Sequence, residues 1–236
     1  MRHLLPVLAL AALTAPSPLP AQTPATASLP AWQTAIQQRR EALIANNGPG
    51  ADIGLRDRLL KMRETDQTAR GLIPGTAYQG TQQERLQNLA AVDTQLTAEL
   101  KSIVADKGWP TIALVGIDAS DAAMLVLTHT ADHAWQLQLL PHLEQLADAG
   151  TINAAPLALV IDKQLVATGK PQRYGSQFKL VNGRMAMYAV EDPGGLDNLR
   201  ARAMLPPMDV YKQQLARIYG LKPTNDIVTA TPPTTP

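Results

Sequence analysis

Residues 81–108 read TQQERLQNLAAVDTQLTAELKSIVADKG, and this stretch decides the fold class. Thr81 and Glu84 have the spacing of a capping box, in which each side chain satisfies a backbone amide of the first helical turn. Apolar residues then recur at intervals of three and four up to Val104, which is the period of an amphipathic helix. Gly108 follows as a helix stop. The sequence therefore predicts a long helix between Thr81 and Gly108.

Comparable signals predict that most of the remaining chain is helical. Apolar residues with helical spacing, bounded by glycine, asparagine or proline, predict helices over about residues 31–46, 52–70, 122–131, 133–149, 156–168, 195–203 and 207–219. Asp118 or Ser120 is positioned to cap the third of these helices. Pro141 lies inside the fourth, which it should kink or restart because proline has no backbone N–H to donate.

Residues 177–190 break the helical period. Asn182-Gly183 separates two short segments in which apolar residues partly alternate, and this dipeptide supplies the two positive-φ positions of a type I′ turn. The pattern predicts a β-hairpin. The expected fold is therefore mainly α, a multi-helix single domain with one small β-hairpin near the C-terminal third.

The N-terminal 21 residues have the three-part pattern of a secretory signal peptide. Arg2 supplies the basic start, Leu4 to Ala15 is almost wholly apolar, and Ala21 is a small residue at the expected cleavage point. The apolar run is shorter than the ~20 residues that a membrane-spanning helix needs. We therefore expect cleavage after Ala21 and a periplasmic or secreted bacterial protein.

Composition divides the rest of the chain into three parts. Residues 22–28 are expected to form a linker, and residues 29–222 are expected to form the helical domain. Residues 223–236 are rich in proline and threonine, and such a segment buries too little apolar surface to offset the entropy of ordering. We expect these last residues to be a disordered tail.

Cysteine content and charge exclude several function classes. The chain has no cysteine, so we expect no disulfide, no cysteine-ligated metal and no lipid anchor on a cysteine. Basic and acidic groups balance once residues 1–21, with Arg2 and no acid, are set aside. A net charge near zero gives no field that attracts nucleic acid or an anionic membrane. We therefore expect no nucleic-acid partner, and no transmembrane segment after cleavage.

A polar loop is the first candidate site. Residues 169–177 read GKPQRYGSQ and lie between a predicted helix and the hairpin. Loops held by rigid elements commonly carry binding groups, so Gln172, Tyr174, Ser176 and Gln177 are candidate ligand-binding residues. The alternative is a structural connector, in which the glutamine side chains satisfy backbone groups of the turn.

Two titratable residues on predicted apolar helices are candidates for chemistry. His129 is either an acid–base group or a core residue that bonds a carbonyl. Asp162 either orients His129 or pairs with Arg173 or Arg200. A Ser176–His129–Asp162 triad can be written, but Ser176 lacks the G-x-S-x-G turn that exposes a hydrolase nucleophile.

A metal site has weaker support. His129 and His133 stand four residues apart, which is the spacing of two metal ligands on one helix face. No glutamate completes an H-E-x-x-H pattern, and a third ligand would have to come from Asp132, His142 or Asp162. We therefore expect no metal and no cofactor.

Several motifs follow one another along the chain. They are Gly108-Trp109-Pro110, Leu114-Val115-Gly116, His129, Asp162-Lys163, Gly169-x-x-Gln172-x-Tyr174-Gly175-Ser176-Gln177 and Arg200-x-x-x-x-Leu205-Pro206 with Tyr211. Their order resembles a bacterial domain family of unknown function that carries G-W-P, Q-H-A, D-R and G-x-x-Q-x-Y-G-T-Q motifs. The resemblance covers about residues 80–215 and implies no established activity.

The chain departs from the resembled motifs at four positions. It has Thr128 for glutamine, Thr130 for alanine, Lys163 for arginine and Ser176 for threonine. Threonine at position 176 in the family would weigh against a serine nucleophile and would keep a hydroxyl as a hydrogen-bond donor. Lys163 cannot reproduce the bidentate contact of an arginine.

These observations favour an exported domain with a polar pocket that binds a small polar or cell-envelope ligand and, in one version, hydrolyses it. His129 would be the acid–base group and Asp162 its orienter, while Arg200 and the polar loop would bind the substrate. A non-enzymatic module would instead present the Tyr174-Gly175-Ser176-Gln177 loop and the hairpin to a partner. A third interpretation is a structural hydrogen-bond network. The pocket and the network both require His129, Asp162 and the loop to meet in space.

Overall fold

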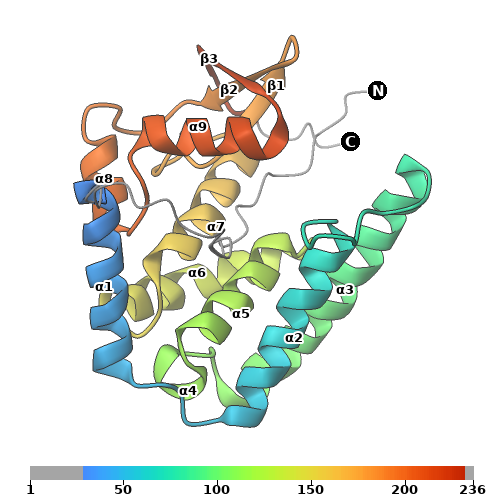
Figure 1. The fold of residues 1–236 in the computed structure, drawn as a ribbon, viewed down its shortest axis with the longest axis vertical. Helices are drawn as coiled ribbons and strands as arrows, with labels where there is room; N and C mark the ends of the chain where they lie inside the picture. Colours follow the sequence, from blue (N-terminus) through green and yellow to red (C-terminus); the bar gives the residue numbers. More distant parts are fainter. Residues whose placement is uncertain (1–28, 232–236) are drawn as a thin grey trace, which may run out of the picture.

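The computed structural model of the chain describes residues 29–231 (Figure 1). The predicted signal peptide 1–21, the predicted linker 22–28 and the last five residues of the expected tail lie outside the described residues. The elements follow in the order α1 (Ala31–Asn47), α2 (Ile53–Ala69), α3 (Gln82–Lys107), α4 (Ile112–Val115), α5 (Ile117–His129), α6 (His133–Asp148), α7 (Ala154–Ala167), β1 (Phe178–Val181), β2 (Arg184–Tyr188), α8 (Leu196–Arg202), α9 (Met208–Tyr219) and β3 (Lys222–Val228). The expected mainly helical fold is confirmed.

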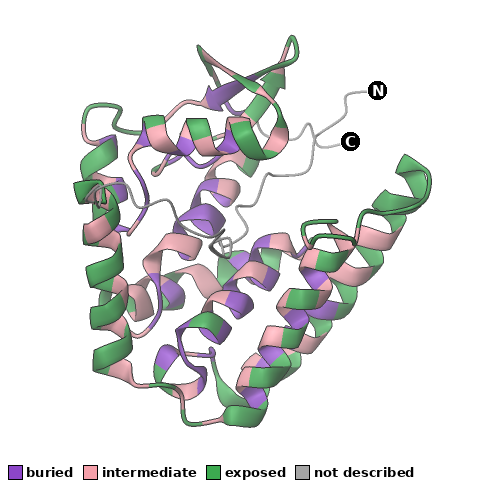
Figure 2. Cartoon of the chain, in the orientation of Figure 1, coloured by how far each residue is buried: buried purple, intermediate pink, exposed green. Residues whose placement is uncertain are grey.

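The helices form one body around α5. Helices α2 and α3 lie side by side along one edge, α1 lies along the opposite edge, and α5, α6 and α7 fill the space between them (Figure 1). Helix α5 is apolar on most sides and contacts α2, α3 and α7, so nearly all of its length is buried. Figure 2 shows buried positions concentrated on α5, α7 and the inward faces of α2 and α3. Among the described residues, no helix is both long enough and apolar enough to cross a bilayer.

Local capping explains where several helices begin. The predicted capping box is confirmed at the start of α3, where Glu84 Oε2 accepts from the Thr81 amide at 2.8 Å and Thr81 Oγ1 accepts from the Glu84 amide. Asp52 caps α2 and Asp132 caps α6 through carboxylate oxygens, and Asn153 caps α7. Each side chain satisfies an amide that would have no helical partner.

The predicted cap of α5 is wrong, and α6 does not restart at Pro141. Helix α5 begins at Ile117 without a side-chain cap, because Gly116 at φ 80° turns the chain directly from the short helix α4 into α5. Helix α6 also continues through Pro141 instead of restarting there. Leu137, four residues earlier, is exposed, so water can satisfy the carbonyl that loses its partner.

The predicted hairpin is confirmed, but the tail beyond it is not. Asn182 at φ 49° and Gly183 at φ 73° join β1 to β2, as a type I′ turn requires. Strand β3 pairs with β2 in parallel, so residues 223–228 are ordered and not part of a disordered tail. Composition misled the prediction because proline is compatible with an edge strand such as β3. The outer side of an edge strand has no neighbouring strand, so no backbone hydrogen bond is lost there.

A second, smaller core joins the sheet to the helical body. Six buried side chains lie between the sheet and α8 and α9: Met185, Met187, Leu196, Met208, Tyr211 and Leu215. A further group connects Ala158 and Leu159 of α7 to Ala203 and Leu205. The polar loop 169–177 runs between these cores, which explains why Gln172, Gly175, Ser176 and Gln177 are buried.

Candidate functional site

Asp162 serves the polar loop as a cap. Its Oδ1 accepts from the backbone amides of Arg173 at 2.7 Å and Tyr174 at 3.0 Å, and its Oδ2 accepts from the Ser176 amide at 2.8 Å. Burial raises the pKa of Asp162, and the three amide donors act in the opposite direction. The carboxylate is fully buried, so its oxygens face the loop backbone and not a ligand.

Gln172 holds the loop to the hairpin. Its Nε2 donates to the carbonyls of Gln177 at 3.1 Å and Tyr188 at 2.8 Å, and its Oε1 accepts from the Gln177 amide at 2.8 Å. Gly175 has φ 70°, and a Cβ there would lie 2.4 Å from Met208 Cε. Gln172 and Gly175 of the loop motif therefore both have a structural explanation.

Arg200 also belongs to this network. Its side chain is fully buried, Nε donates to the Pro206 carbonyl at 2.7 Å, and Nη1 donates to the Tyr174 carbonyl. The guanidinium lies 4.7 Å from the centre of the Tyr211 ring. A residue enclosed in this way holds the loop against α9 and does not face a cleft.

The expected meeting of residues is therefore correct for the loop and wrong for His129. Asp162, Gln172, Tyr174, Ser176, Gln177 and Arg200 gather in one network. No hydrogen bond or ion pair joins His129 to any of them in residues 29–231. Because Gly175, Ser176 and Gln177 are buried, the alternative of an exposed Tyr174-Gly175-Ser176-Gln177 contact loop also loses its basis.

His129 pairs with a different carboxylate, Asp66 of α2. His129 Nδ1 lies 2.6 Å from Asp66 Oδ1. Arg70 lies beside this pair, with Nε 3.1 Å from the same His129 nitrogen and Nη2 3.2 Å from Asp66 Oδ1. Arg70 Nη2 also reaches Asp93 Oδ1 of α3 at 2.5 Å. We call these residues and Lys163 the His129 cluster.

Lys163 of α7 closes the cluster on another side. Its Nζ donates to the Thr128 carbonyl, one residue before His129, at 2.5 Å. Burial lowers the pKa of Lys163 to about 8, and the charges of Asp93 and Arg70 act on it in opposite directions. Lys163 and Asp162 are neighbours on α7, yet one serves the His129 cluster and the other caps the loop.

Burial and charge compete at the two carboxylates. Burial alone would raise the pKa of Asp66, but the His129 hydrogen bond and the charges of His129 and Arg70 outweigh it and lower the pKa. Burial raises the pKa of Asp93 despite the charge of Arg70. Of the two carboxyl groups, Asp66 therefore stays ionised to a lower pH than Asp93.

The helix patterns explain why these side chains meet. Asp66 continues the buried face of α2 formed by Leu55, Leu59 and Met62, so it points into the body like an apolar residue. Asp66 is not among the residues predicted for the site, which all lie after residue 80. A carboxylate in an apolar helical stripe was the signal that could have found it.

His133 does not join His129. Residues 130–132 separate α5 from α6, so the two histidines are not on one unbroken helix face. His133 Nδ1 instead lies 3.3 Å from both Gln136 Oε1 and Gln164 Nε2. The ligand pair considered from their spacing is therefore not formed.

The His129 cluster itself could surround a cation. One ligand atom from each of Asp66, Asp93 and His129 lies within 4.8 Å of the others. Arg70 already donates to both carboxylates, so a metal ion would have to displace its guanidinium. This arrangement fits a charge-compensated acid–base group better than a metal site.

The cluster reaches solvent only at its rim. The His129 side chain is 9% exposed, Arg70 17% and Asp93 19%, whereas Asp66 is fully buried. A cavity of about 410 Å³ and another of about 270 Å³ lie elsewhere, and neither is lined by the cluster. A ligand would therefore meet His129 at a shallow surface with a buried carboxylate behind it.

A family model described as "Family of unknown function (DUF6624)" matches residues 53–224. The match begins at α2, so it includes Asp66 and Arg70 as well as the loop, and it confirms the expected relation to an uncharacterised domain family. Helix α1 precedes it. No curated protein and no solved structure matches the chain. The matched region is more than half of the chain, and the protein therefore belongs to the family of unknown function DUF6624.

Proposed function

We propose that the domain binds a small polar ligand from the cell envelope and hydrolyses it with His129 as the acid–base group. One observation carries the proposal: a fully buried carboxylate, Asp66, lies 2.6 Å from Nδ1 of a histidine that still reaches solvent. A buried carboxylate that accepts from Nδ1 holds an imidazole in one orientation and leaves the other nitrogen for acid–base catalysis.

The proposed chemistry follows from the two nitrogens of the imidazole. If Nδ1 carries the proton that Asp66 accepts, Nε2 is the basic nitrogen. No described residue hydrogen-bonds to Nε2, so it can take a proton from a water molecule and later return it to a leaving group. Asp66 would stabilise the imidazolium that forms between these two steps.

Arg70 and Lys163 would supply positive charge beside the reacting group. Arg70 is permanently charged and partly exposed. Lys163, with its pKa lowered to about 8, is mostly charged at neutral pH and loses its proton in the mildly alkaline range. Both charges would favour an anionic transition state, as expected for hydrolysis of an ester or amide.

Muropeptides released from purified peptidoglycan are a direct probe. We expect the protein to convert a subset of them to products that have gained water, detected by mass spectrometry. His129→Gln should slow this conversion by about 100-fold or more. His142→Gln is the matched control because His142 is exposed on α6. No conversion by the wild-type protein, or equal rates for the His129 and His142 variants, would refute the proposal.

Export is part of the proposal and has a separate test. Its support is the basic, apolar and small-residue pattern of residues 1–21. Intact-mass measurement of the protein from its native host should show a chain that begins near Gln22 in the periplasmic or culture fraction. A cytoplasmic chain that retains Met1 would contradict export without bearing on His129.

A further inference from the structure

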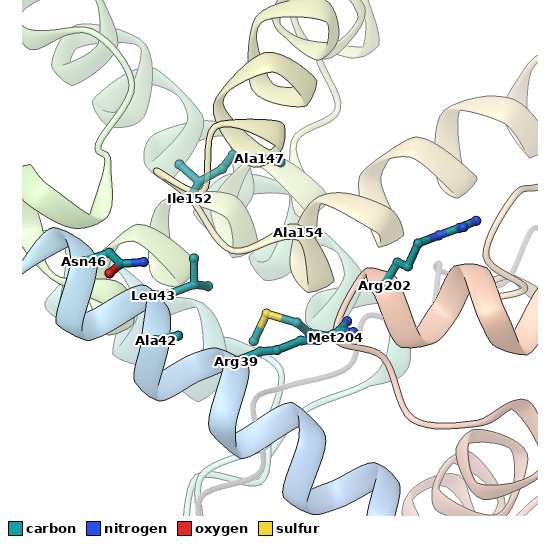
Figure 3. A pocket seen from close by; sticks show the side chains of 9 residues that line it. All are labelled: Arg39, Ala42, Leu43, Asn46, Ala147, Ile152, Ala154, Arg202 and Met204. Carbon is teal, nitrogen blue, oxygen red and sulfur yellow. The ribbon is translucent and has the colours of Figure 1, made fainter.

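A cavity of about 410 Å³ lies between α1 and the rest of the domain (Figure 3), and no residue of the His129 cluster lines it. We call it the α1 cavity. One wall comes from α1, a second from the α6–α7 connection, and a third from the end of α8. Nine residues line it: Arg39, Ala42, Leu43, Asn46, Ala147, Ile152, Ala154, Arg202 and Met204. Its volume lies in the range typical of small-molecule sites, roughly 300–1,000 Å³.

Helix α1 covers this cavity without being packed into the core. None of its residues is buried, although Trp32, Ile36, Arg40, Leu43 and Asn47 form a half-buried stripe with helical spacing. Polar contacts hold the helix in place: Arg40 pairs with Asp118, and Asn47 donates to the Gly150 carbonyl. The half-buried stripe is therefore only partly covered by the rest of the domain.

The cavity is apolar along its length and positively charged at one end. Leu43, Ile152 and Met204 bring apolar side chains to it from three different elements (Figure 3). Arg39 and Arg202 lie at the α8 end, where the Arg202 side chain extends away from the apolar walls. Asn46 is seven residues along α1 from Arg39, which is about 10 Å of helix.

No acidic side chain lines the cavity, and Arg39 forms no ion pair with a described residue. Arg202 also lines the second cavity, beside Glu191 and Asp192, so its charge is shared with that side. Arg39 donates to the Ala201 carbonyl, which orients it but does not neutralise it. Guanidinium groups without a counter-charge bind carboxylates through paired hydrogen bonds. The charge at this end therefore fits an anionic head group.

Met204 is held in an unusual conformation at the same place. It has φ 61°, and the Leu205 amide bonds to the Arg200 carbonyl, as in a helix end that normally carries glycine. A methionine here adopts a backbone conformation that side chains disfavour. Its thioether lines the cavity, so the strained position supplies apolar surface that glycine would not.

We propose that the α1 cavity binds a free carboxylate amphiphile, with its apolar chain between Leu43, Ile152 and Met204 and its carboxylate at Arg39. The proposal is independent of hydrolysis at His129. The wall that α1 supplies lies outside the family match, whereas the other walls lie within it.

Titration calorimetry with decanoate below its micelle concentration tests the site. We expect one decanoate per protein, whereas acetate, which lacks the chain, and decyltrimethylammonium, which has the opposite charge, should not bind measurably. Absence of decanoate binding, equal binding of the cationic amphiphile, or binding of many decanoates per chain would overturn the proposal. Sedimentation with phosphatidylglycerol vesicles but no decanoate binding would place the contact on a membrane, which also contradicts a free ligand.

Two variants locate the bound molecule. Ala42→Leu fills the cavity from α1 and should weaken decanoate binding about tenfold or more, whereas Ala45→Leu, on an exposed position of the same helix, should leave it unchanged. Arg39→Gln should also weaken binding about tenfold, with Arg85→Gln as the control for charge. Unchanged binding by both cavity variants would show that decanoate binds elsewhere.

Discussion

Asp66 Oδ1 lies 2.6 Å from His129 Nδ1, although the two residues are 63 positions apart and belong to different helices. The contact forms because Asp66 occupies a core-facing position of α2 and His129 is the last residue of α5, which packs against α2. A buried carboxylate is tolerated only with strong donors, and His129, Arg70 and Gln67 supply them. The pair therefore contributes to stability as well as to the proposed chemistry.

We predict that Asp66→Ala lowers the free energy of unfolding at pH 7 by about 3 kcal/mol or more, because it leaves buried donors of Arg70 and His129 without their acceptor. The lowered pKa of Asp66 means that this stabilisation is present above about pH 4 and is lost as the pH falls through the lowered value. Urea denaturation measures it. Glu64→Ala, which removes an exposed ion pair with Lys61, should cost no more than about 0.5 kcal/mol.

Asp121 should make the domain less stable as the pH rises. Burial raises its pKa to about 6, its Oδ1 has no partner among the described residues, and Arg40 is 3.4 Å from its Oδ2. The folded state therefore binds a proton more tightly than the unfolded state, so this group lowers the free energy of unfolding between about pH 4 and pH 6.

Asp121→Asn should thus raise the free energy of unfolding at pH 8 by up to about 3 kcal/mol relative to wild type, and by less at pH 5. Chemical denaturation at both values measures the difference. Asp118→Asn is the matched control, because Asp118 also pairs with Arg40 but is mostly exposed. An equal effect of the two variants at pH 8 would contradict the assignment to Asp121.

Two glycine substitutions should have opposite signs. Gly183→Ala should destabilise the domain by about 1 kcal/mol, because Gly183 has φ 73° although a Cβ there would meet nothing within 4 Å. Gly54→Ala should be neutral or stabilising by up to about 1 kcal/mol, because Gly54 lies in α2 without a positive φ and with room for a methyl group. Thermal denaturation of both variants gives the comparison, and equal shifts would refute the hairpin argument.

The polar loop should matter for folding and not for turnover. Gln172→Ala removes three buried hydrogen bonds and should cost at least about 2 kcal/mol. Tyr174→Phe should cost no more than about 0.5 kcal/mol, because only the backbone groups of Tyr174 form hydrogen bonds with described residues. Both should leave muropeptide conversion per folded molecule unchanged. If Tyr174→Phe kept its stability but lost muropeptide conversion, the loop would be part of the catalytic site.

The elements with local signals could be predicted from the sequence. The Thr81–Glu84 capping box and the Asn182-Gly183 turn each depend on neighbouring residues, and both are present. Strand β3 depends on pairing with β2, which is more than 30 residues away, and its sequence, KPTNDIV, carries no strand period. The strand is therefore a consequence of tertiary pairing that composition conceals.

The candidate site could be predicted only in part, because it too depends on contacts between distant segments of the chain. His129 could be singled out as a titratable residue on an apolar helix, but its partner could not be chosen from spacing. Asp162 follows an apolar run in the same way as Asp66 follows its stripe, and both are buried carboxylates. Helix packing decides between them, because α2 brings Asp66 to His129 while the loop amides occupy Asp162.

The position of the proton on the His129 imidazole decides whether Nε2 can act as the base. Asp66 Oδ1 can only accept at His129 Nδ1, whereas Arg70 Nε, 3.1 Å from the same nitrogen, can only donate to it. The shorter contact with Asp66 predicts that Nδ1 carries the proton, which leaves Nε2 free to act as the base. Long-range ¹H–¹⁵N NMR spectra of the protein, assigned with His129→Gln, should show this tautomer. A His129 protonated at Nε2 instead, with Nδ1 accepting from Arg70, would contradict the proposed role.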